Sequence, residues 1–494
     1  MKVGIFYFRS LYSQSASSLS VGKFSDYLLS KGYNVKLGVL KNDDYANNRN
    51  QLKTIIDNDI IIYKTNYKDF EYGIRFFKGI KEFYKNKKIY LIGPFANLNQ
   101  KRIKAKYDFI EDIVNMQDIN VIDKVFPIIG EPIKKDTIIY GVDREIEYLE
   151  NGKYINLEAS TGCIYNCSFC HVNILKYKNE TVDVDWLVNE IDLLVNKMHK
   201  KYLIFNDSVF WKDEKDTERI NQIVYKIKQR NIKFYFMIYL SLTSKIPVEL
   251  LDKLKEIGLI RVFFGVENIS KNFQTSNNKY VSEKETKNFI KLLEDRNITY
   301  HIGFILFSYE TKYEELLINL QFLKDIKKLF RPGIIVEKMR ILPHSKNEDI
   351  LYECNDKIDQ AYNYKIKDDK VQKAYELTNE FFANINIRNF EHFFTSINLA
   401  IGIIKRENIE KEFIKEANYY YEVLNHINTE IYNILKMMYT NLEYSNEDLL
   451  RILDLYSESE IMYITFTKKL RDIAPDIFMI LPHGKEDLNI WFMV

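Results

Sequence analysis

The chain has 494 residues, more than one ordinary hydrophobic core accommodates, so its length predicts two or three domains. Lys and Arg number 71 and Asp and Glu 69, and this near-balance excludes a global attraction to nucleic acid or to anionic membrane. The first residues, MKVGIFYFRS, resemble a strand rather than a leader, and no apolar run approaches the roughly 18 residues of a membrane span. We therefore expect a soluble, cytoplasmic protein.

Residues 1–125 alternate short β-rich runs with helical stretches. The runs KVGIFYF, YNVKLGVL, DIIIYKT and KKIYLIG are separated by amphipathic segments such as YGIRFFKGIKEFYKN. Strands that alternate with amphipathic helices predict a Rossmann-like, doubly wound and mostly parallel sheet. Residues 126–152 lack clear periodicity, and we interpret them as a connector.

A second α/β pattern extends over residues 153–348. Six β-rich runs follow one another with helical segments between them: YINLEAS, KYLIFND, IKFYFMIYL, GLIRVFFGVE, ITYHIGFIL and GIIVEKMRIL. This alternation predicts a second α/β domain. From 349 to 494 the spacing becomes helical, as in FIKEANYYYEVLNHINTEIYNILKMMY, which predicts an α-helical C-terminal domain.

Three of the four cysteines lie within eight positions, in the stretch TGCIYNCSFCHV. Cys163, Cys167 and Cys170 have the spacing CxxxCxxC, and a short loop lets three thiolates hold three corners of an iron–sulfur cubane. The fourth iron then has no protein ligand and stays open for chemistry.

Other interpretations of these cysteines remain. A zinc ion would need a fourth ligand, for which His171 is available, but adjacent positions such as 170 and 171 reach one tetrahedral ion poorly. A redox dithiol would use Cys167 and Cys170 and leave Cys163 idle. Buried structural cysteines are disfavoured by the turn-rich composition of the loop.

The loop at the end of YINLEAS, with Phe169 before the last cysteine, resembles the cluster loop of the radical SAM superfamily. The resemblance implies a [4Fe-4S] cluster on Cys163, Cys167 and Cys170 whose open iron binds S-adenosylmethionine (SAM). It also implies one-electron cleavage of SAM to methionine and a 5′-deoxyadenosyl radical, with the electron from an external donor such as flavodoxin or ferredoxin. The fold implied is a partial (β/α)6 TIM-type barrel, which agrees with the six predicted strands.

The same resemblance assigns SAM-binding residues at the ends of the predicted strands. It places Phe169 against adenine. The residues that it places at the methionyl and ribose groups are Asn206, Asp207, Ser208, Ser241, Gly265, Glu267 and Asn268. Ser208 is equally well explained as a helix N-cap. FYFMIYLSLT departs from the family pattern, because related enzymes often have an arginine where this chain offers Tyr239 and Ser241.

Three further residues are candidates for catalysis or substrate contact. His301 and His344 stand at predicted strand ends, where either side chain could donate a proton, although a lone histidine is more often structural. Cys354 could donate a hydrogen atom to a substrate radical because a thiol S–H bond is weak. A cysteine in a helical segment is more often a small buried apolar residue.

Residues 1–125 resemble the cobalamin-binding domain that precedes the barrel in one radical SAM subclass, and IGPFANL stands at the expected strand exit. The resemblance suggests Lys64, Thr65, Gly93 and Pro94 as cobalamin contacts. All seven histidines lie at or beyond 171, so this domain offers cobalt no imidazole. A domain without cofactor that only shapes the substrate cavity is the alternative.

The resulting hypothesis is a radical SAM enzyme that abstracts hydrogen from an unactivated carbon of a metabolite, natural product or peptide. Bound cobalamin would indicate C-methylation. Without it, we expect epimerisation, dehydrogenation, deoxygenation or C–C bond formation. A tRNA-modifying methylthiotransferase is disfavoured because residues 1–125 contain no cysteine for a second cluster. A non-catalytic iron–sulfur relay or sensor would leave Asp207 and Glu267 unexplained.

Overall fold

The structure, a computed structural model, describes residues 1–9, 19–41, 45–66, 69–116, 118–132, 154–329, 332–350, 364–383, 387–407 and 411–474. The chain divides into two compact units. The first comprises Met1–Cys163, Phe169–Glu180 and Arg340–Asn363, and the second comprises Ile164–Ser168, Thr181–Met339 and Tyr364–Val494. The domain boundaries at 125, 152 and 348 stay a prediction. Across the described stretches, no helix is both long and apolar enough to cross a membrane.

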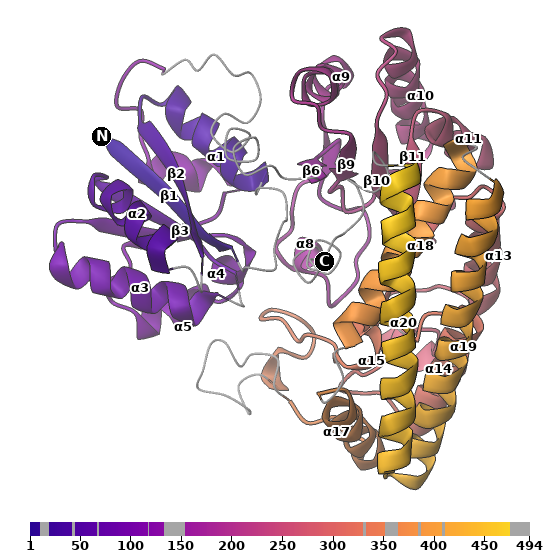
Figure 1. The fold of residues 1–494 in the computed structure, drawn as a ribbon. Helices are drawn as coiled ribbons and strands as arrows, with labels where there is room; N and C mark the ends of the chain where they lie inside the picture. Colours follow the sequence, from indigo (N-terminus) through magenta and orange to yellow (C-terminus); the bar gives the residue numbers. More distant parts are fainter. Residues whose placement is uncertain are drawn as a thin grey trace. The chain divides into compact units, whose positions relative to one another are not determined.

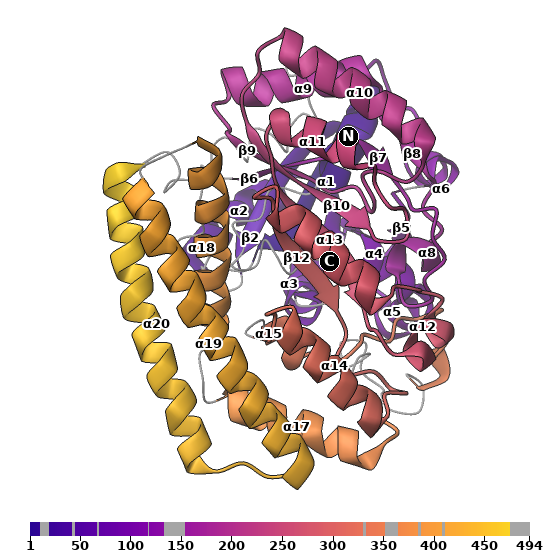
Figure 2. The ribbon, with the colours of Figure 1, turned by 90° about the vertical axis from the view of Figure 1, so that its right-hand side faces the viewer.

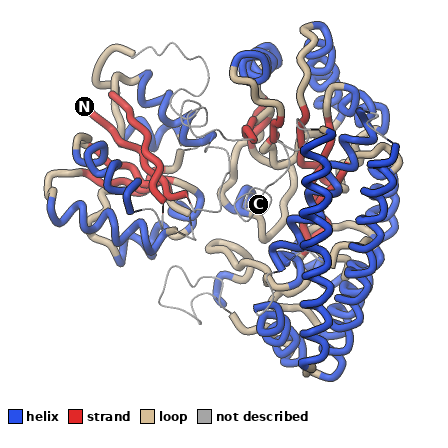
Figure 3. Tube along the Cα trace, viewed as in Figure 1, coloured by secondary structure: helices blue, strands red, loops and turns tan. Residues whose placement is uncertain are grey.

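A five-stranded parallel sheet of order β2-β1-β3-β4-β5 forms the centre of the first unit (Figures 1 and 3). Its strands are β1 (Lys2–Arg9), β2 (Asn34–Lys41), β3 (Ile60–Lys64), β4 (Lys88–Ile92) and β5 (Asp112–Val114). The helices between them are α1 (Leu19–Ser30), α2 (Tyr45–Ile56), α3 (Phe70–Phe83), α4 (Pro94–Leu98), α5 (Gln100–Lys106) and α6 (Ile119–Val125). This order is that of flavodoxin-like doubly wound sheets, so the Rossmann-like prediction is confirmed.

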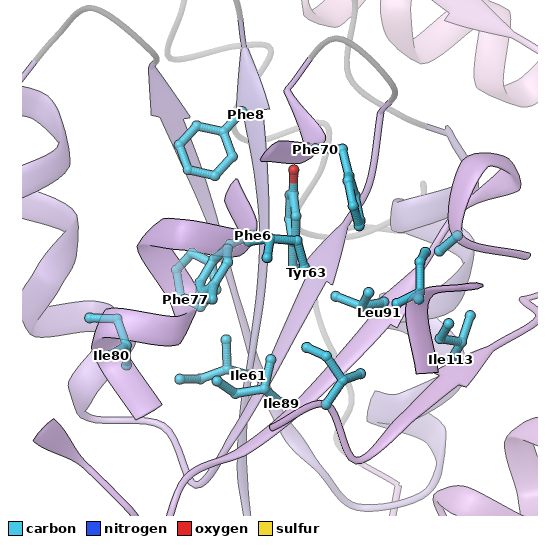
Figure 4. Packing of buried hydrophobic residues seen from close by; sticks show 14 of the residues in the cluster. Phe6, Phe8, Ile61, Tyr63, Phe70, Phe77, Ile80, Ile89, Leu91 and Ile113 are labelled. Atoms are coloured by element: carbon cyan, nitrogen blue, oxygen red, sulfur yellow. The ribbon is translucent and has the colours of Figure 1, made fainter. Parts of the chain in front are cut away.

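Alternation along the central strands builds an apolar layer on each face of this sheet. In β1, Val3 and Ile5 point into one cluster of buried side chains, and Phe6 and Phe8 point into the other. The Phe6 and Phe8 cluster is rich in aromatic rings, and the Tyr63 and Phe77 rings meet with centroids 5.0 Å apart (Figure 4). Burial on both faces explains why these strands are nearly continuous apolar runs.

The second sheet has the order β12-β11-β10-β9-β6, and β9 to β12 pair in parallel. Its strands are β6 (Tyr154–Leu157), β9 (Tyr202–Phe205), β10 (Tyr235–Ser241), β11 (Leu259–Glu267) and β12 (Thr299–Phe304). The connecting helices are α9 (Val184–Asp192), the π-helical turn η1 (Leu193–Lys197), α10 (Glu214–Gln229), α11 (Val248–Glu256), α12 (Lys271–Asn277), α13 (Glu283–Glu294) and α14 (Tyr313–Asp325).

Strand register sorts the side chains of β10, β11 and β12 into two faces. The outer face is apolar: Phe264 meets Phe289 of α13 edge-on, with ring centroids 5.1 Å apart. The inner face holds three successive rows of paired residues, counted from the amino ends of the strands: Met237, Arg261 and Thr299; then Tyr239, Phe263 and His301; then Ser241, Gly265 and Gly303. The last row therefore lies at the carboxyl ends, where active sites of barrel folds lie.

The prediction of a sixth strand over GIIVEKMRIL was wrong in extent. Its beginning lies in a helical turn, α15 (Pro332–Ile335), and its later part makes a single parallel bridge between Lys338 and Phe307. The Tyr364 hydroxyl donates to the Met339 carbonyl at 2.7 Å, and the Lys338 ammonium lies over the Tyr364 ring. The Met339 carbonyl, which a regular strand would use to pair with a neighbour, thus accepts from a side chain instead.

The C-terminal region is helical, as predicted, with α17 (Asp369–Ala383), α18 (Ile387–Glu407), α19 (Lys411–Asn441) and α20 (Asn446–Ile473). Figure 2 shows α18, α19 and α20 side by side, and contacts between all three agree. Helix α18 lies against β11 and β12, where a Cβ on Gly402 would stand 3.0 Å from Thr299 Cγ2. Because Thr299 belongs to the first inner row, α18 covers the amino end of that face.

We expect Phe77→Ala to destabilise the first sheet by about 3–5 kcal/mol, because the substitution removes a fully buried ring and leaves a cavity. Hydrogen–deuterium exchange of β1 and β3 would report this as faster exchange. Phe83→Ala at the exposed end of the same helix is the control, because Phe83 is 86% exposed. Equal exchange in the two variants would contradict the packing described.

Candidate active site

The cysteine loop is closed at its base by a two-stranded sheet of β7 (Ser160–Thr161) and β8 (Glu180–Thr181). The Thr161 hydroxyl donates to the Lys178 carbonyl at 3.0 Å. Gly162 has a φ of +68°, and a Cβ there would stand 2.4 Å from the same carbonyl oxygen. Only glycine combines this backbone conformation with so close an approach, so Gly162 sets the turn into the first cysteine.

Cys163, Cys167 and Cys170 are partly exposed and form no disulfide. In the described part of the chain, no three His, Cys, Asp or Glu side chains are arranged as a metal site. The assignment of these cysteines as ligands therefore depends on their spacing and their accessible thiols. His171 begins the short helix α8 (His171–Ile174), and burial lowers the pKa of its imidazole, which favours the neutral ring.

Helix α12 holds the middle of the cysteine loop. The Ser168 amide donates to the Asn277 carbonyl at 3.2 Å, and the Ser168 hydroxyl donates to Asn277 Oδ1 at 2.9 Å. The next residue, Asn278, donates from Nδ2 to the Asn166 carbonyl at 3.1 Å. Asn278 has a φ of +52°, a left-handed conformation that asparagine tolerates at a helix end. Sequence analysis did not identify these two asparagines.

Glu267 lies across the row of glycines at the carboxyl end of the sheet. A Cβ added to Gly265 would stand 2.1 Å from Glu267 Oε1, and one added to Gly303 would stand 3.5 Å from Oε2. The Glu267 backbone has a φ of +64° and stands where the pairing of β11 with β12 shifts register. Left-handed conformations of residues other than glycine are rare and concentrate at functional sites.

The charge environment of Glu267 is mixed. Burial raises the pKa of its carboxyl group, and the nearby Lys279 ammonium lowers it. Lys279 Nζ stands 3.7 Å from the point that a Gly265 Cβ would occupy. Lys279 was not predicted, because it follows Glu267 by a whole helix and no sequence pattern joins the two.

Asn268 is buried and its side-chain amide is engaged within the protein. Its Oδ1 accepts from the Ser270 amide at 2.8 Å and from Asn319 Nδ2 at 3.0 Å, and its Nδ2 donates to the Ile305 carbonyl at 3.0 Å. These bonds tie the end of β11 to α14 and to the residue after β12. The geometry thus gives Asn268 a role in positioning Glu267.

The remaining predicted SAM residues lie at or near strand ends. Asn206 and Ser208 follow β9 and are exposed, while Asp207 between them is 1% exposed. Ser241 ends β10 in the row with Gly265, and its hydroxyl accepts from the Thr243 amide at 3.3 Å. Phe169 is half-buried in the cysteine loop.

Two of the three catalytic candidates lie within the described residues, in different surroundings. His301 is 4% exposed and lies on the inner face one row, about 7 Å, beneath the glycines. His344 stands in a turn with a φ of +66°, and its Nδ1 lies 3.6 Å from Glu348 Oε1, with the imidazole 54% exposed. Cys354 falls outside the described residues.

The four candidates in the first sheet lie where β3 and β4 end. The Thr65 hydroxyl donates to the Ile92 carbonyl at 3.0 Å and accepts from the Ala96 amide at 3.1 Å, so it mainly shapes these strand ends. The Lys64 ammonium lies 5.9 Å from the centre of the Tyr7 ring. Gly93 has a φ of +107° and Pro94 begins α4.

Comparison with known proteins identifies the domain that contains these features. Residues 157–323 match the radical SAM superfamily. The chain contains a radical SAM domain. This family implies a [4Fe-4S] cluster and SAM as cofactors. The match begins at the strand before the cysteine loop and includes Glu267 and α12.

The chain is also similar to individual proteins. It is 20% identical over 220 residues to the ribosomal protein uS12 methylthiotransferase RimO of Dictyoglomus thermophilum, covering 43% of this chain and 50% of the relative. The chain thus spans about half the length of the curated relative that it matches. Its fold resembles a solved structure titled as the cobalamin-dependent SAM radical enzyme OxsB, with 14% identity, a TM-score of 0.65, and 99% and 84% of the two chains covered.

A second solved structure is the radical SAM methyltransferase TsrM of Kitasatospora setae. The TsrM structure contains bound cobalamin and a [4Fe-4S] cluster. It shares 14% identity and a TM-score of 0.54 with this chain, and the match covers 71% of this chain and 78% of the TsrM chain. At such identities the likeness shows the fold alone.

We expect Asn277→Ala to loosen the middle of the cysteine loop, because the Ser168 hydroxyl loses its acceptor while the backbone bond remains. A lost hydrogen bond of about 1 kcal/mol corresponds to roughly fivefold more frequent local opening. Reaction of Cys167 with a maleimide in metal-free protein would measure the change. Asn272→Ala, at an exposed position of the same helix, should leave the rate unchanged. Equal rates in both variants would refute the clamp.

Proposed function

We propose that this radical SAM enzyme cleaves SAM reductively at a cluster held by Cys163, Cys167 and Cys170, and abstracts hydrogen from an unactivated carbon. One observation carries the proposal. Helix α12 binds the cysteine loop and follows directly on the segment that places Glu267 over the glycine row. When bound, the cluster and SAM supply a 5′-deoxyadenosyl radical. The substrate class we propose is a small metabolite, natural product or peptide, with the electron supplied by a flavodoxin or ferredoxin.

The protein's own groups then bind and orient. Glu267 accepts from the ammonium of the methionyl group, a charge-assisted contact that its partly desolvated position strengthens. Asn268 keeps Glu267 in place, and Ser241 contributes a hydroxyl in the same row. Phe169, half-buried beside the last cysteine, offers an aromatic surface for adenine.

Three further residues complete the proposed SAM site and one completes the substrate side. Asp207 and its exposed neighbours Asn206 and Ser208 follow β9 and supply further acceptors for the amino group. His301 contacts the substrate from the row beneath the glycines, where it is positioned to exchange a proton. His344 and Cys354 stay candidates for the same step.

We also propose that residues 1–125 hold cobalamin without an axial nitrogen from the protein. The sheet order places the β1 and β3 ends, with Lys64, at the switch point where flavodoxin-like sheets bind ligands. Gly93 lets the ends of β3 and β4 approach closely, because a Cβ there would stand 3.0 Å from the Thr65 carbonyl oxygen. The OxsB and TsrM structures, which contain bound cobalamin, support this proposal.

The cofactor decides between two outcomes. With cobalamin, C-methylation is the proposed reaction, in keeping with TsrM, which is a methyltransferase. Without it, hydrogen abstraction supports epimerisation, dehydrogenation, deoxygenation or C–C bond formation. Methylthio transfer of the kind named for RimO is disfavoured, because residues 1–125 have no cysteine for a second cluster.

Anaerobic reconstitution tests the cluster. We expect about four irons and four sulfides per chain, with release of 5′-deoxyadenosine and methionine from SAM under reducing conditions. Replacing Cys163, Cys167 and Cys170 by alanine should abolish iron binding and SAM cleavage together. Cys354→Ala is the matched control and should keep its iron. A stable zinc ion in place of iron, or iron without SAM cleavage, would overturn the proposal.

Incubation with hydroxocobalamin tests the first domain. We expect one corrinoid per chain to remain after gel filtration, detected by its visible absorption, and corrinoid-dependent formation of S-adenosylhomocysteine from SAM. Formation of 5′-deoxyadenosine alone, with no retained corrinoid, would instead support the cobalamin-independent reactions.

A further inference from the structure

Helix α20 carries exposed apolar side chains on the face opposite its contacts with α18 and α19 (Figure 2). On the packed face, the Phe466 ring is buried and stacks on Phe413 of α19. On the opposite face, Leu450 is 60% exposed, Ile461 67% and Ile464 59%. The outer face of a helix normally carries charged and polar side chains, and grouped apolar side chains mark a contact surface.

These side chains belong to a row that is symmetric about Ser457. The members of this α20 row are spaced three, four, four and three residues apart: Leu450, Leu453, Ser457, Ile461 and Ile464. At about 100° per residue, all five positions stay within about 40° of the direction of Ser457, so the row is straight. Its order of two large, one small and two large side chains is the same when read from either end.

A symmetric row of this kind fits a second copy of itself turned end for end. In a two-fold interface between identical chains, each contact occurs twice, with the roles of the two chains exchanged. Antiparallel pairing of two α20 helices about Ser457 brings Leu450 of one copy against Ile464 of the other, and Leu453 against Ile461. The small serine at the centre lets the two helix backbones approach closely.

The charges along α20 complement the same arrangement. Glu447 lies in the first turn and Lys468 near the end of the helix, and both side chains are exposed. Antiparallel pairing places Glu447 of each copy beside Lys468 of the other, whereas a parallel pair would place each charge beside its own copy. The helix dipoles are also opposed, which favours the antiparallel pair. Asp454 and Glu460 border the row on its two sides as a polar rim.

We propose that the protein forms a two-fold dimer through antiparallel pairing of α20 along the α20 row. No residue of the proposed SAM site belongs to α20, so the dimer is independent of the proposed function. The row spans 14 residues, or about 21 Å of helix. This length gives a contact at the small end of specific interfaces, for which we expect a dissociation constant in the micromolar range.

Sedimentation equilibrium of the reconstituted full-length protein, over a series of micromolar concentrations, tests the dimer. We expect the mass to rise toward twice the 59.0 kDa of one chain. Leu450→Lys and Ile464→Glu should each weaken dimerisation about 100-fold or more, because each change removes two aliphatic contacts per dimer and puts a charge in their place. Ile318→Glu, at a 54% exposed position on α14, is the control and should leave the dimer intact.

Leu450→Lys and Ile464→Glu in one chain test the register. Antiparallel pairing then sets an ammonium beside a carboxylate at both ends of the row, so the double variant should dimerise about tenfold more tightly than either single variant. A monomer at every concentration, or a dimer that neither single variant weakens, would overturn the proposal. Weakened single variants with no recovery in the double variant would assign this face to another partner or pairing, and would overturn it as well.

Ser457→Cys tests the two-fold axis directly. The two copies of position 457 face each other across the axis, so mild oxidation of the full-length protein should link them by a disulfide. Glu458→Cys, about 100° further around the helix, is the matched control and should cross-link no more than the unsubstituted protein, which reports any link through the native cysteines. Equal cross-linking at positions 457 and 458 would contradict the proposed pairing.

Discussion

The shared register of β10, β11 and β12 decides which side chains the inner face of the barrel presents. Side chains alternate along a strand, so a slip of one residue would turn Val262 and Phe264 inward and remove the glycine row from the inner face. In the observed register, Ser241, Gly265 and Gly303 form the row at the carboxyl ends. Their small size leaves room for the Glu267 side chain to lie over them.

The segment that contains α12 links the cysteine loop and the charged side chains of Glu267 and Lys279 to this register. The chain leaves β11 at Glu267, passes through α12, holds Ser168 with Asn277, and then places Lys279 beside the same glycines. A single segment of thirteen positions, from 267 to 279, therefore fixes an acid, a base and part of the loop. Movement of α12 would shift all three, so their relative positions depend on its packing.

Much of this fold follows from local sequence. Alternating apolar runs such as KVGIFYF predict the strands of the first sheet, because both faces of those strands are buried. The cysteine spacing and Glu267 at a strand end are also visible in one dimension. The segment GIIVEKMRIL was predicted as a strand because of its β-rich composition. In the structure it instead forms a helical turn and one bridge, and the Lys338 ammonium lies over the Tyr364 ring.

The parts of the site that the sequence did not predict depend on contacts between segments that lie far apart in the chain. Asn277 and Lys279 lie in a polar stretch, FQTSNNKY, that resembles an ordinary helix end, and only the return of the chain to the glycine row gives them partners. Asn268 shows the reverse case. Its position in the motif is evident from the sequence, but its bonds to Ser270, Asn319 and Ile305 give it a structural role that no local pattern reveals.

Charged side chains and aromatic rings occupy successive rows at the carboxyl end of the inner face. Glu267 and Lys279 stand over the glycine row, while the row beneath holds Tyr239 and Phe263, whose rings lie 5.2 Å apart between centroids. Burial raises the pKa of Tyr239 to about 12, so its phenol stays neutral at physiological pH. The row beneath the glycines thus combines the Tyr239 and Phe263 rings with the His301 imidazole. At the opposite end of the sheet, α18 packs against Thr299.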